Sequence, residues 1–334
     1  MFGEKIGPGE ADQGIERERQ PRYVINISRH AERLPSGELA PEGVESAQKF
    51  GQELGQTAEV VKGYASDHLS KRAYATAELA SQASGVTSPV RAAAKAHKER
   101  LGSGFDQATG YVTREVSDIQ YDILKPGGLA KRVATVTDKI NEATLREAGL
   151  STERDEQGKL RIAIDALPAG EQLRLAPIRQ KYQEQGLSEV LKDPAVVERL
   201  AMGLGHQVVH QLELLKRYSG VRKAAEQPVE KDVVLNTTSH GMFGESLLMK
   251  AGIYRKSDGQ EVPIDDWGDP ELNLGPVIQP AESYYLQVDD PSNVPHRIPV
   301  LFRGADRPPQ GTIFIDTAKL LALEETYQQW KTSQ

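Results

Sequence analysis

The sequence predicts an α/β fold: a three-layer α/β/α sandwich with a mostly parallel central sheet and an inserted, largely helical cap. Strand-like and helix-like patterns alternate from residue 23 to about residue 96, and two strand-like runs, 23–29 and 232–239, are each followed by a histidine. The cap is predicted from residues 104–193, where the alternation is lost, charged residues crowd together, and Gly and Pro interrupt.

The elements of the first part can be read in order along the chain. Residues 1–22 are rich in Gly, Glu, Gln and Arg, so we expect a flexible tail ahead of a folded domain over 23–334. Apolar spacing then predicts a strand from Tyr23, a helix over 41–54, a strand within 60–65, a helix over 69–81 and a strand within 86–96.

The second part begins with the cap and returns to the sheet. Within the cap we expect helices near 129–148 and 171–191, and Pro194 opens a long helix with one apolar stripe. The remaining expected elements are a strand over 232–239, three strands over 284–288, 298–303 and 312–316, and a terminal helix.

Composition excludes several classes of protein. The chain has 334 residues, 38% of them hydrophobic and 27% charged, which is typical of a globular protein of one or two domains. No apolar run approaches the roughly 18 residues of a membrane span, and the N-terminal segment lacks the apolar centre of a secretory signal. We therefore expect no membrane contact and a cytoplasmic location.

Charge and cysteine content narrow the chemistry. The formal net charge of −7 argues against broad nucleic-acid binding, which needs an excess of Lys and Arg, but a few arginines can still bind a small anionic substrate. The chain has no cysteine, which excludes disulfides, thiolate metal sites and a cysteine nucleophile. Any covalent catalysis must use another side chain.

Two histidines and several arginines form a coherent set for phosphoryl transfer. His30 and His240 each follow a strand, where open α/β sheets place their chemistry; Arg29 and Arg33 flank the first histidine, and Arg72 lies at a helix start. Neutral imidazole can attack phosphorus in line while guanidinium groups hold the oxygens. A metal ion is then unnecessary, so we expect no metal and no cofactor.

Three segments resemble motifs of the histidine phosphatase superfamily, which also contains the cofactor-dependent phosphoglycerate mutases. Ser28–Arg33 resembles the Arg-His-Gly loop, Leu69–Glu78 the second arginine motif, and Thr238–Gly241 the second histidine motif. Their order and separation also fit. The resemblance implies a phosphoglycerate mutase-like fold.

By this resemblance His30 is the phosphorylated nucleophile, Arg29 and Arg72 bind phosphate, and His240 forms a hydrogen bond to the transferring group. A general acid must also protonate the leaving oxygen, and in the mutases a carboxyl group does so. Residues 98–102 resemble the mutase-type segment that supplies it.

That segment nominates Glu99 as the general acid, and Arg100 beside it is nominated as a residue that contacts substrate. Gly241, from the second histidine motif, is nominated for the same contact. Ala31 replaces the glycine that normally follows the nucleophile, a change that would be strained at a positive φ. Arg33, followed by Pro35, resembles the ending of the loop in the acid phosphatase and phytase branch, where that arginine also binds phosphate.

Other features favour the intracellular, mutase-like branch. His240 is followed by Gly241 in place of the aspartate of the acid phosphatases, and the sequence lacks disulfides. His206 and His210 have a spacing that can hold a metal, but no Glu follows His206 as in zinc proteases, so we interpret them as structural.

The leading hypothesis is a metal-independent phosphatase, a phosphoric monoester hydrolase that acts on a small phosphorylated substrate through phospho-His30. The cap over 104–193 would then shape access and specificity. Two alternatives remain: a phosphomutase of the phosphoglycerate mutase type, which would retain the phosphoryl group and shield it from water, and a non-catalytic protein that binds a phosphorylated ligand.

Overall fold

The computed structural model describes residues 22–32, 38–66, 72–86, 91–92, 121–227, 229–267, 269, 272, 278, 282–303, 309 and 311–333. Its centre is one sheet with the strand order β3-β2-β4-β1-β7-β8-β9-β5-β6. The strands are β1 (Tyr23–Arg29), β2 (Ala58–Ala65), β3 (Arg91–Ala92), β4 (Asp232–Ser239), β5 (Gly252–Arg255), β6 (Glu261–Pro263), β7 (Ser283–Val288), β8 (Arg297–Arg303) and β9 (Thr312–Asp316).

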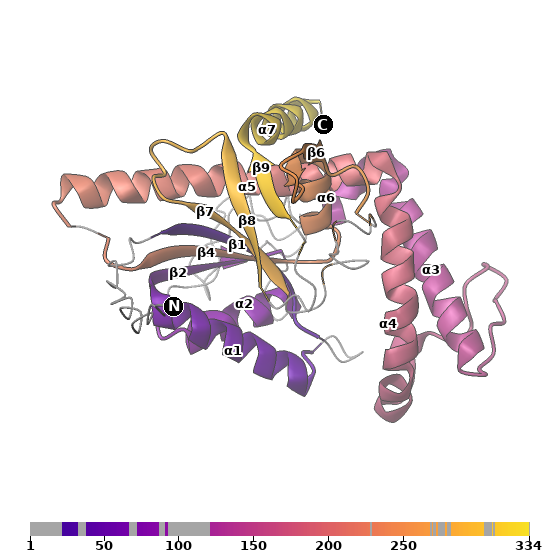
Figure 1. Cartoon of the computed structure of the whole chain (residues 1–334). Helices are drawn as coiled ribbons and strands as arrows, with labels where there is room; N and C mark the ends of the chain where they lie inside the picture. The colour runs from indigo at the N-terminus through magenta and orange to yellow at the C-terminus, as the bar shows by residue number, and fades with distance from the viewer. Residues whose placement is uncertain are drawn as a thin grey trace, which may run out of the picture.

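Helices cover both faces of this sheet (Figure 1). They are α1 (Pro41–Thr57), α2 (Arg72–Ala83), α3 (Leu129–Glu147), α4 (Ala169–Leu191), α5 (Pro194–Ala224), α6 (Phe243–Ala251) and α7 (Thr317–Thr332). Short 3₁₀ turns lie at Tyr121–Leu124, Pro126–Gly128 and Ile164–Ala166. No helix of the described residues is long and apolar enough to cross a membrane.

The sheet is mixed, so the expectation of a mostly parallel sheet was wrong. β1, β2, β3 and β4 run parallel to one another, but the pairings from β1 to β7 and onward to β8, β9, β5 and β6 are antiparallel. The physical reason lies in the connections, since 289–296 and 304–311 are shorter than the dozen or so residues that a parallel crossover needs.

The alternation of side chains along β1 separates two apolar layers. Val24 packs with Leu54 of α1 and Val61 of β2 on one face, whereas Ile25 and Ile27 join the large core on the other face. α5 and α6 contribute most of the helical part of that larger core. Figure 1 shows α1 and α2 on one side of the sheet and α5, α6 and α7 on the other.

α5 is long because its start is well defined and its apolar face is continuous. Pro194 occupies the first turn, and the Asp193 side chain accepts hydrogen bonds from the backbone N–H groups of Ala195 and Val196. At 31 residues the helix is about 46 Å long, enough to cross the whole sheet.

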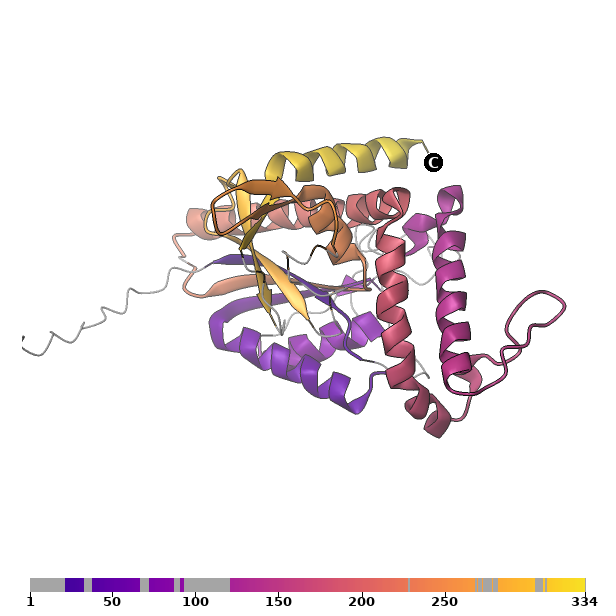
Figure 2. The same cartoon turned by 45° about the vertical axis from the view of Figure 1, so that its right-hand side comes forward.

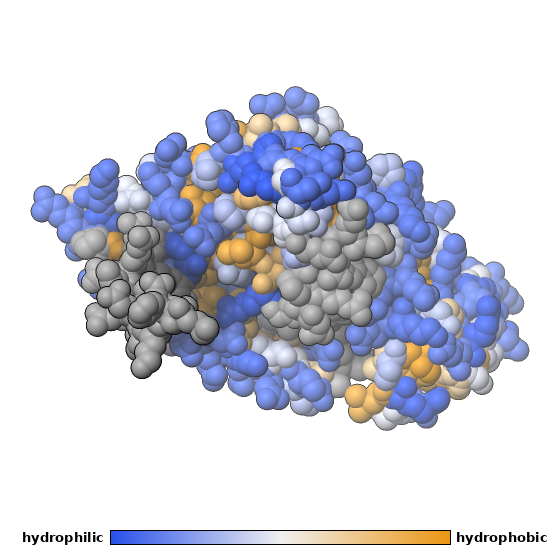
Figure 3. All heavy atoms as spheres, viewed as in Figure 1, coloured by the Kyte–Doolittle hydropathy of each residue, from blue (hydrophilic) through white to orange (hydrophobic). Residues whose placement is uncertain are grey.

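α3 and α4 lie side by side as a helical hairpin beside the sheet (Figure 2). The hairpin has a small core at its outer end, where Leu145, Ile164 and Leu175 are buried together. Hydrophilic residues cover most of the face seen in Figure 3, and an apolar patch lies over the start of α4, where Leu173 is 57% exposed. The two helices expected within 104–193 are therefore present.

The structure contains most of the other expected elements. The helices and strands predicted around 41–54, 60–65, 232–239 and 284–316 are confirmed within a few residues. α6, β5 and β6 were not predicted. The tail predicted over 1–22 lies outside the described residues except for Arg22, which binds Asp232 through its backbone N–H and its guanidinium.

Candidate active site

The two strand-end histidines meet because their strands are neighbours in register. β1 and β4 are parallel, with Arg29 opposite Ser239, so the next residue of each strand falls at the same edge of the sheet. The backbone N–H of His30 donates to the Ser239 carbonyl at 2.9 Å. The rings of His30 and His240 lie 5.5 Å apart between centroids, at 69° to each other.

The start of α2 brings Arg72 to the same place. Nη2 of Arg72 lies 3.3 Å from Nδ1 of His240. One turn later, Thr76 Oγ1 donates to the Arg72 carbonyl at 2.8 Å and accepts from the Ala31 backbone N–H at 3.1 Å. α2 is therefore fastened directly to the loop that carries His30.

Ala31 fits this loop without strain. It is fully buried, and among the described residues only Glu226 and Met242 have positive φ outside glycine, so the position does not require the glycine of the resembled motif.

Arg29 lies on the opposite side of the strand from the α2 contacts, against the turn after β4. Its Nη1 donates to the backbone carbonyl of Ile278 at 2.8 Å, and the side chain is only 8% exposed. A β-carbon at Gly241 would lie 3.3 Å from Arg29 Nε and 3.6 Å from Cδ1 of Leu187 on α4. Gly241 thus leaves the guanidinium room, and α4 reaches the edge of the site.

His30 is held as a neutral imidazole with a defined tautomer. Its Nδ1 lies 2.8 Å from the Ala31 carbonyl oxygen, which can only accept, so Nδ1 carries the hydrogen and Nε2 carries the lone pair. Burial lowers the pKa of His30 well below its ordinary value, and the nearby Arg72, His240 and Arg29 lower it further, against the bond to Ala31.

His240 has the complementary arrangement. A guanidinium can only donate, so Nδ1 of His240 accepts from Arg72 and Nε2 carries the hydrogen. The site therefore presents one histidine nitrogen with a lone pair, one with a hydrogen, and two guanidinium groups. This set can bind a tetrahedral oxyanion and attack its central atom.

The predicted residues Arg29, His30, Arg72, His240 and Gly241 are thus brought together. Arg33, Glu99 and Arg100, which the sequence also nominated, lie outside the described residues. Among the residues that the structure does describe, no three His, Asp or Glu side chains form a group suited to a metal ion. His206 instead contacts Glu324 of α7, with Nδ1 2.6 Å from Oε2, and stacks on Tyr327.

One charged residue near the site was missed. Glu245, the third residue of α6, is 1% exposed, and its Oε1 accepts from the Ile278 backbone N–H at 2.7 Å. Burial raises the pKa of Glu245, while the backbone N–H groups of Glu245, Ile278 and Met242 and the charge of Arg29 oppose that rise. The only signal in the sequence is a glutamate inside the apolar run 243–248.

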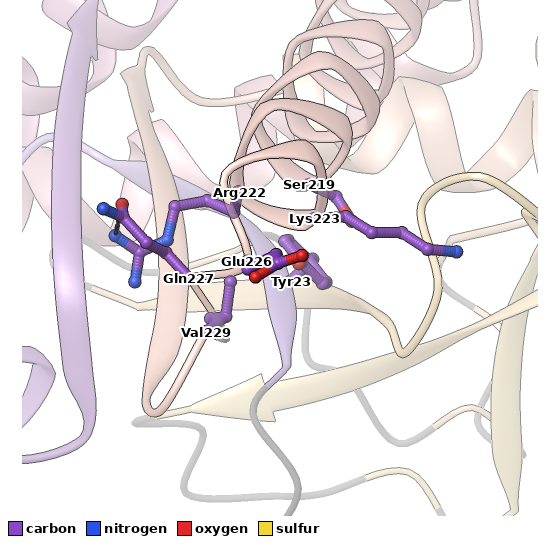
Figure 4. Close-up of a pocket in the computed structure, with 7 residues that line it drawn as sticks. All are labelled: Tyr23, Ser219, Arg222, Lys223, Glu226, Gln227 and Val229. Atoms are coloured by element: carbon purple, nitrogen blue, oxygen red, sulfur yellow. Dashed lines mark hydrogen bonds between the residues drawn. The ribbon is translucent and has the colours of Figure 1, made fainter.

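A surface hollow of about 360 Å³ lies elsewhere, between the end of α5 and the start of β1 (Figure 4). It is lined by Tyr23, Ser219, Arg222, Lys223, Glu226, Gln227 and Val229. Its charges are mixed, and Arg222 already donates to Gln227 at 3.5 Å. Because Tyr23 begins β1 and His30 follows its last residue, the hollow is about 20 Å from the histidines.

Two solved structures are similar to this chain. The crystal structure of a phytase from Klebsiella sp. ASR1 has 16% sequence identity and a TM-score of 0.38, over 92% of this chain and 95% of that one. A mycobacterial glucosyl-3-phosphoglycerate phosphatase has 16% identity and a TM-score of 0.32, over 86% of this chain and 98% of that one. Both are members of the histidine phosphatase superfamily, which the sequence motifs resemble.

No protein-family model matches the chain, and no curated protein matches it in sequence. The TM-scores and identities of the two solved structures are low, so the functional interpretation depends on the side chains of the site.

Proposed function

We propose that the protein is a metal-independent phosphatase that hydrolyses phosphate monoesters through a phosphohistidine intermediate on His30. The observation that carries the proposal is the state of His30: its Nδ1 hydrogen is bound to Ala31, its Nε2 has the lone pair, and two arginines and a second histidine lie beside it. A structural histidine would need none of these neighbours.

In the first step, Nε2 of His30 attacks phosphorus. The N–P bond forms as the ester P–O bond breaks, and the leaving oxygen takes up a proton from a general acid. Arg29 and Arg72 hold the phosphoryl oxygens, and the Nε2 hydrogen of His240 donates to one of them. These groups are fixed before substrate arrives, since each has a partner in the fold.

In the second step, a water molecule attacks the phosphohistidine and gives up a proton to the conjugate base of the general acid, which is thereby restored. A new P–O bond forms, the N–P bond breaks, and inorganic phosphate leaves while Nε2 regains its lone pair. The lowered pKa of His30 keeps the free ring neutral at neutral pH, so Nε2 has its lone pair available at the start of each turnover.

The test is hydrolysis of an aryl phosphate in the presence of a chelator, with His30→Ala as the decisive variant. We expect the wild-type rate to survive chelation and the variant to lose at least about 10³-fold in kcat. A quenched reaction with ³²P-labelled substrate should label the wild type with an acid-labile, alkali-stable phosphoryl group. His296→Asn, which changes an exposed histidine, is the matched control.

Other outcomes would select the alternatives. Full activity in His30→Ala would refute the nucleophile. Transfer of phosphate between positions of a sugar acid, with little release, would identify a mutase. Thermal protection by phosphate with no turnover and no labelling would identify a binding protein.

A further inference from the structure

The backbone of Ile278 connects Arg29 to a buried carboxyl group. Its carbonyl accepts from Arg29 Nη1 at 2.8 Å, and its N–H donates to Glu245 Oε1 at 2.7 Å. Glu245 therefore determines where the Ile278 backbone lies, and the Ile278 carbonyl determines where the guanidinium of Arg29 lies.

The same carboxyl group acts on the turn that follows His240. Glu245 is the third residue of α6, and the N–H groups of Met242 and of Glu245 itself stabilise its charged form. This is the arrangement in which a glutamate reaches back to the start of its own helix. Met242 has a φ of 78°, which bulky residues rarely adopt, and it lies two residues after His240.

A purely structural role does not require this residue. Burying a carboxyl group is costly unless hydrogen bonds compensate, and a helix start in an apolar core can be capped by a small neutral side chain. The side chains around it are also fixed: the fully buried Tyr284 donates from its hydroxyl to the Gly244 carbonyl at 3.2 Å. The carboxyl group thus contacts the backbone of Ile278, which binds Arg29, and the backbone of Met242, which follows His240.

We propose that Glu245 is a positioning residue for the phosphate site: its carboxyl group, through Ile278 and Met242, sets the placement of Arg29 and His240. The inference rests on the proposed function, since it concerns the same site. It predicts that side-chain reach is what matters at this position, because the hydrogen bond to Ile278 depends on the length of the glutamate.

The experiment compares the dissociation constant of inorganic phosphate, measured by titration calorimetry on the full chain, in Glu245→Asp and Glu245→Gln. Aspartate keeps the charge and suits a helix start, but it is one methylene too short to reach Ile278. We expect ten- to a hundredfold weaker binding, the usual effect of a misplaced binding group. Glutamine keeps the length and one acceptor oxygen, which is enough for the Ile278 N–H, so it should weaken phosphate binding less than aspartate does.

Asp232→Asn is the matched control. Asp232 is also a buried carboxylate with hydrogen bonds, to Arg22, but it begins β4 at the opposite end from His240. The control should lower the unfolding midpoint and leave phosphate binding unchanged.

Several results would overturn the inference. The first is wild-type phosphate binding in Glu245→Asp. The second is phosphate binding as weak in Glu245→Gln as in Glu245→Asp, which would mean that the charge of the side chain and not its reach is responsible. The third is phosphate binding as weak in Asp232→Asn as in Glu245→Asp. If the wild type binds phosphate without hydrolysing esters, and Glu245→Asp still weakens that binding, the proposed function fails and the positioning role stands. If hydrolysis is normal in both Glu245 variants, the positioning role fails alone.

Discussion

At the residue scale, the hydroxyl of Thr76 joins α2 to the His30 loop. It accepts from Ala31 and donates to Arg72, and the side chain is 4% exposed. Thr76→Val keeps the shape and leaves the Ala31 N–H buried without an acceptor. We expect a loss of about 1–3 kcal/mol in unfolding free energy, measured with urea, together with a lower kcat/KM.

Thr326→Val serves as the comparison for that measurement. Thr326 makes the same bond to the carbonyl four residues earlier, at 2.8 Å, but the bond is exposed at the surface of α7 and the residue is only half-buried. Its replacement should change stability by less than about 0.5 kcal/mol. Equal losses in the two variants would show that Thr76 does no more than a surface threonine.

The pH dependence of activity follows from His30. Burial and the neighbouring arginines lower its pKa, so the reactive neutral ring persists below the ordinary histidine value of about 6.5. We expect kcat/KM to fall on the acid side with an apparent pKa below about 6.5. An acid limb centred above that value would contradict the assignment if it persists when the other histidines are replaced one at a time.

Stability should respond to the same group. The unfolded chain has the higher His30 pKa and binds more protons as the pH falls below about 6.5, so the contribution of His30 to stability is present above that pH and lost below it. Urea midpoints of His30→Asn should decline less than those of the wild type between pH 7 and pH 5. Parallel curves would mean that the folded-state pKa is not depressed.

Sequence reasoning nominated four residues that the structure brings together: Arg29, His30, Arg72 and His240. They were nominated because two strand-end histidines with nearby arginines suit phosphoryl transfer, and because their segments resemble motifs of one superfamily. Glu245 and Ile278 were not found, since one looked like part of an apolar helix and the other contributes only its backbone. Backbone donors and acceptors carry no sequence signal.

At the element scale, the contact between α3 and α4 depends on Gly186. A β-carbon there would lie 2.5 Å from Ile140 Cδ1 and 3.0 Å from Val136 Cγ1. Cδ1 of Leu187, the next residue, lies 3.6 Å from the position of a β-carbon at Gly241. We therefore expect a change in the spacing of the hairpin to reach the edge of the site.

Gly186→Leu should overpack this contact and cost about 1–3 kcal/mol of unfolding free energy, with a larger KM for substrates because α4 is displaced. Gly170→Leu, at a position of α4 with nothing within 4 Å of a β-carbon, should not destabilise the protein. Circular dichroism melts and steady-state kinetics of both variants provide the comparison. An undisturbed KM in Gly186→Leu would separate the hairpin from the site.

Most elements could be predicted because they are long and periodic, as α5 and β4 are. β5 and β6 have four and three residues, too few to show a period, and their neighbour α6 has only nine. The later strands were expected to be parallel because the alternation of strands and helices in the first part of the chain was assumed to continue in the second part. Only the short connections there indicate antiparallel strands.

At the scale of the whole molecule, a net charge of −7 coexists with a site that gathers positive charge. The acidic side chains are mostly outside: pairs such as Glu142 with Arg154 and Glu147 with Lys181 lie on the surface of the α3–α4 hairpin. Arg29, in contrast, is buried at the strand ends. Recognition of an anion therefore depends on local geometry and not on the overall charge.

The pairing of β1 with β4 also constrains how the protein can be made. Asn26 and Asn236, whose side chains form a 2.7 Å hydrogen bond between these strands, are 210 residues apart in the chain. A ribosome adding about 5–20 residues per second would release His30 many seconds before its partner strand exists. Until then the strand that will become the centre of the sheet has two unpaired edges, so nascent chains are exposed to aggregation and to chaperone binding. The candidate site cannot form before β4 and His240 have been synthesised.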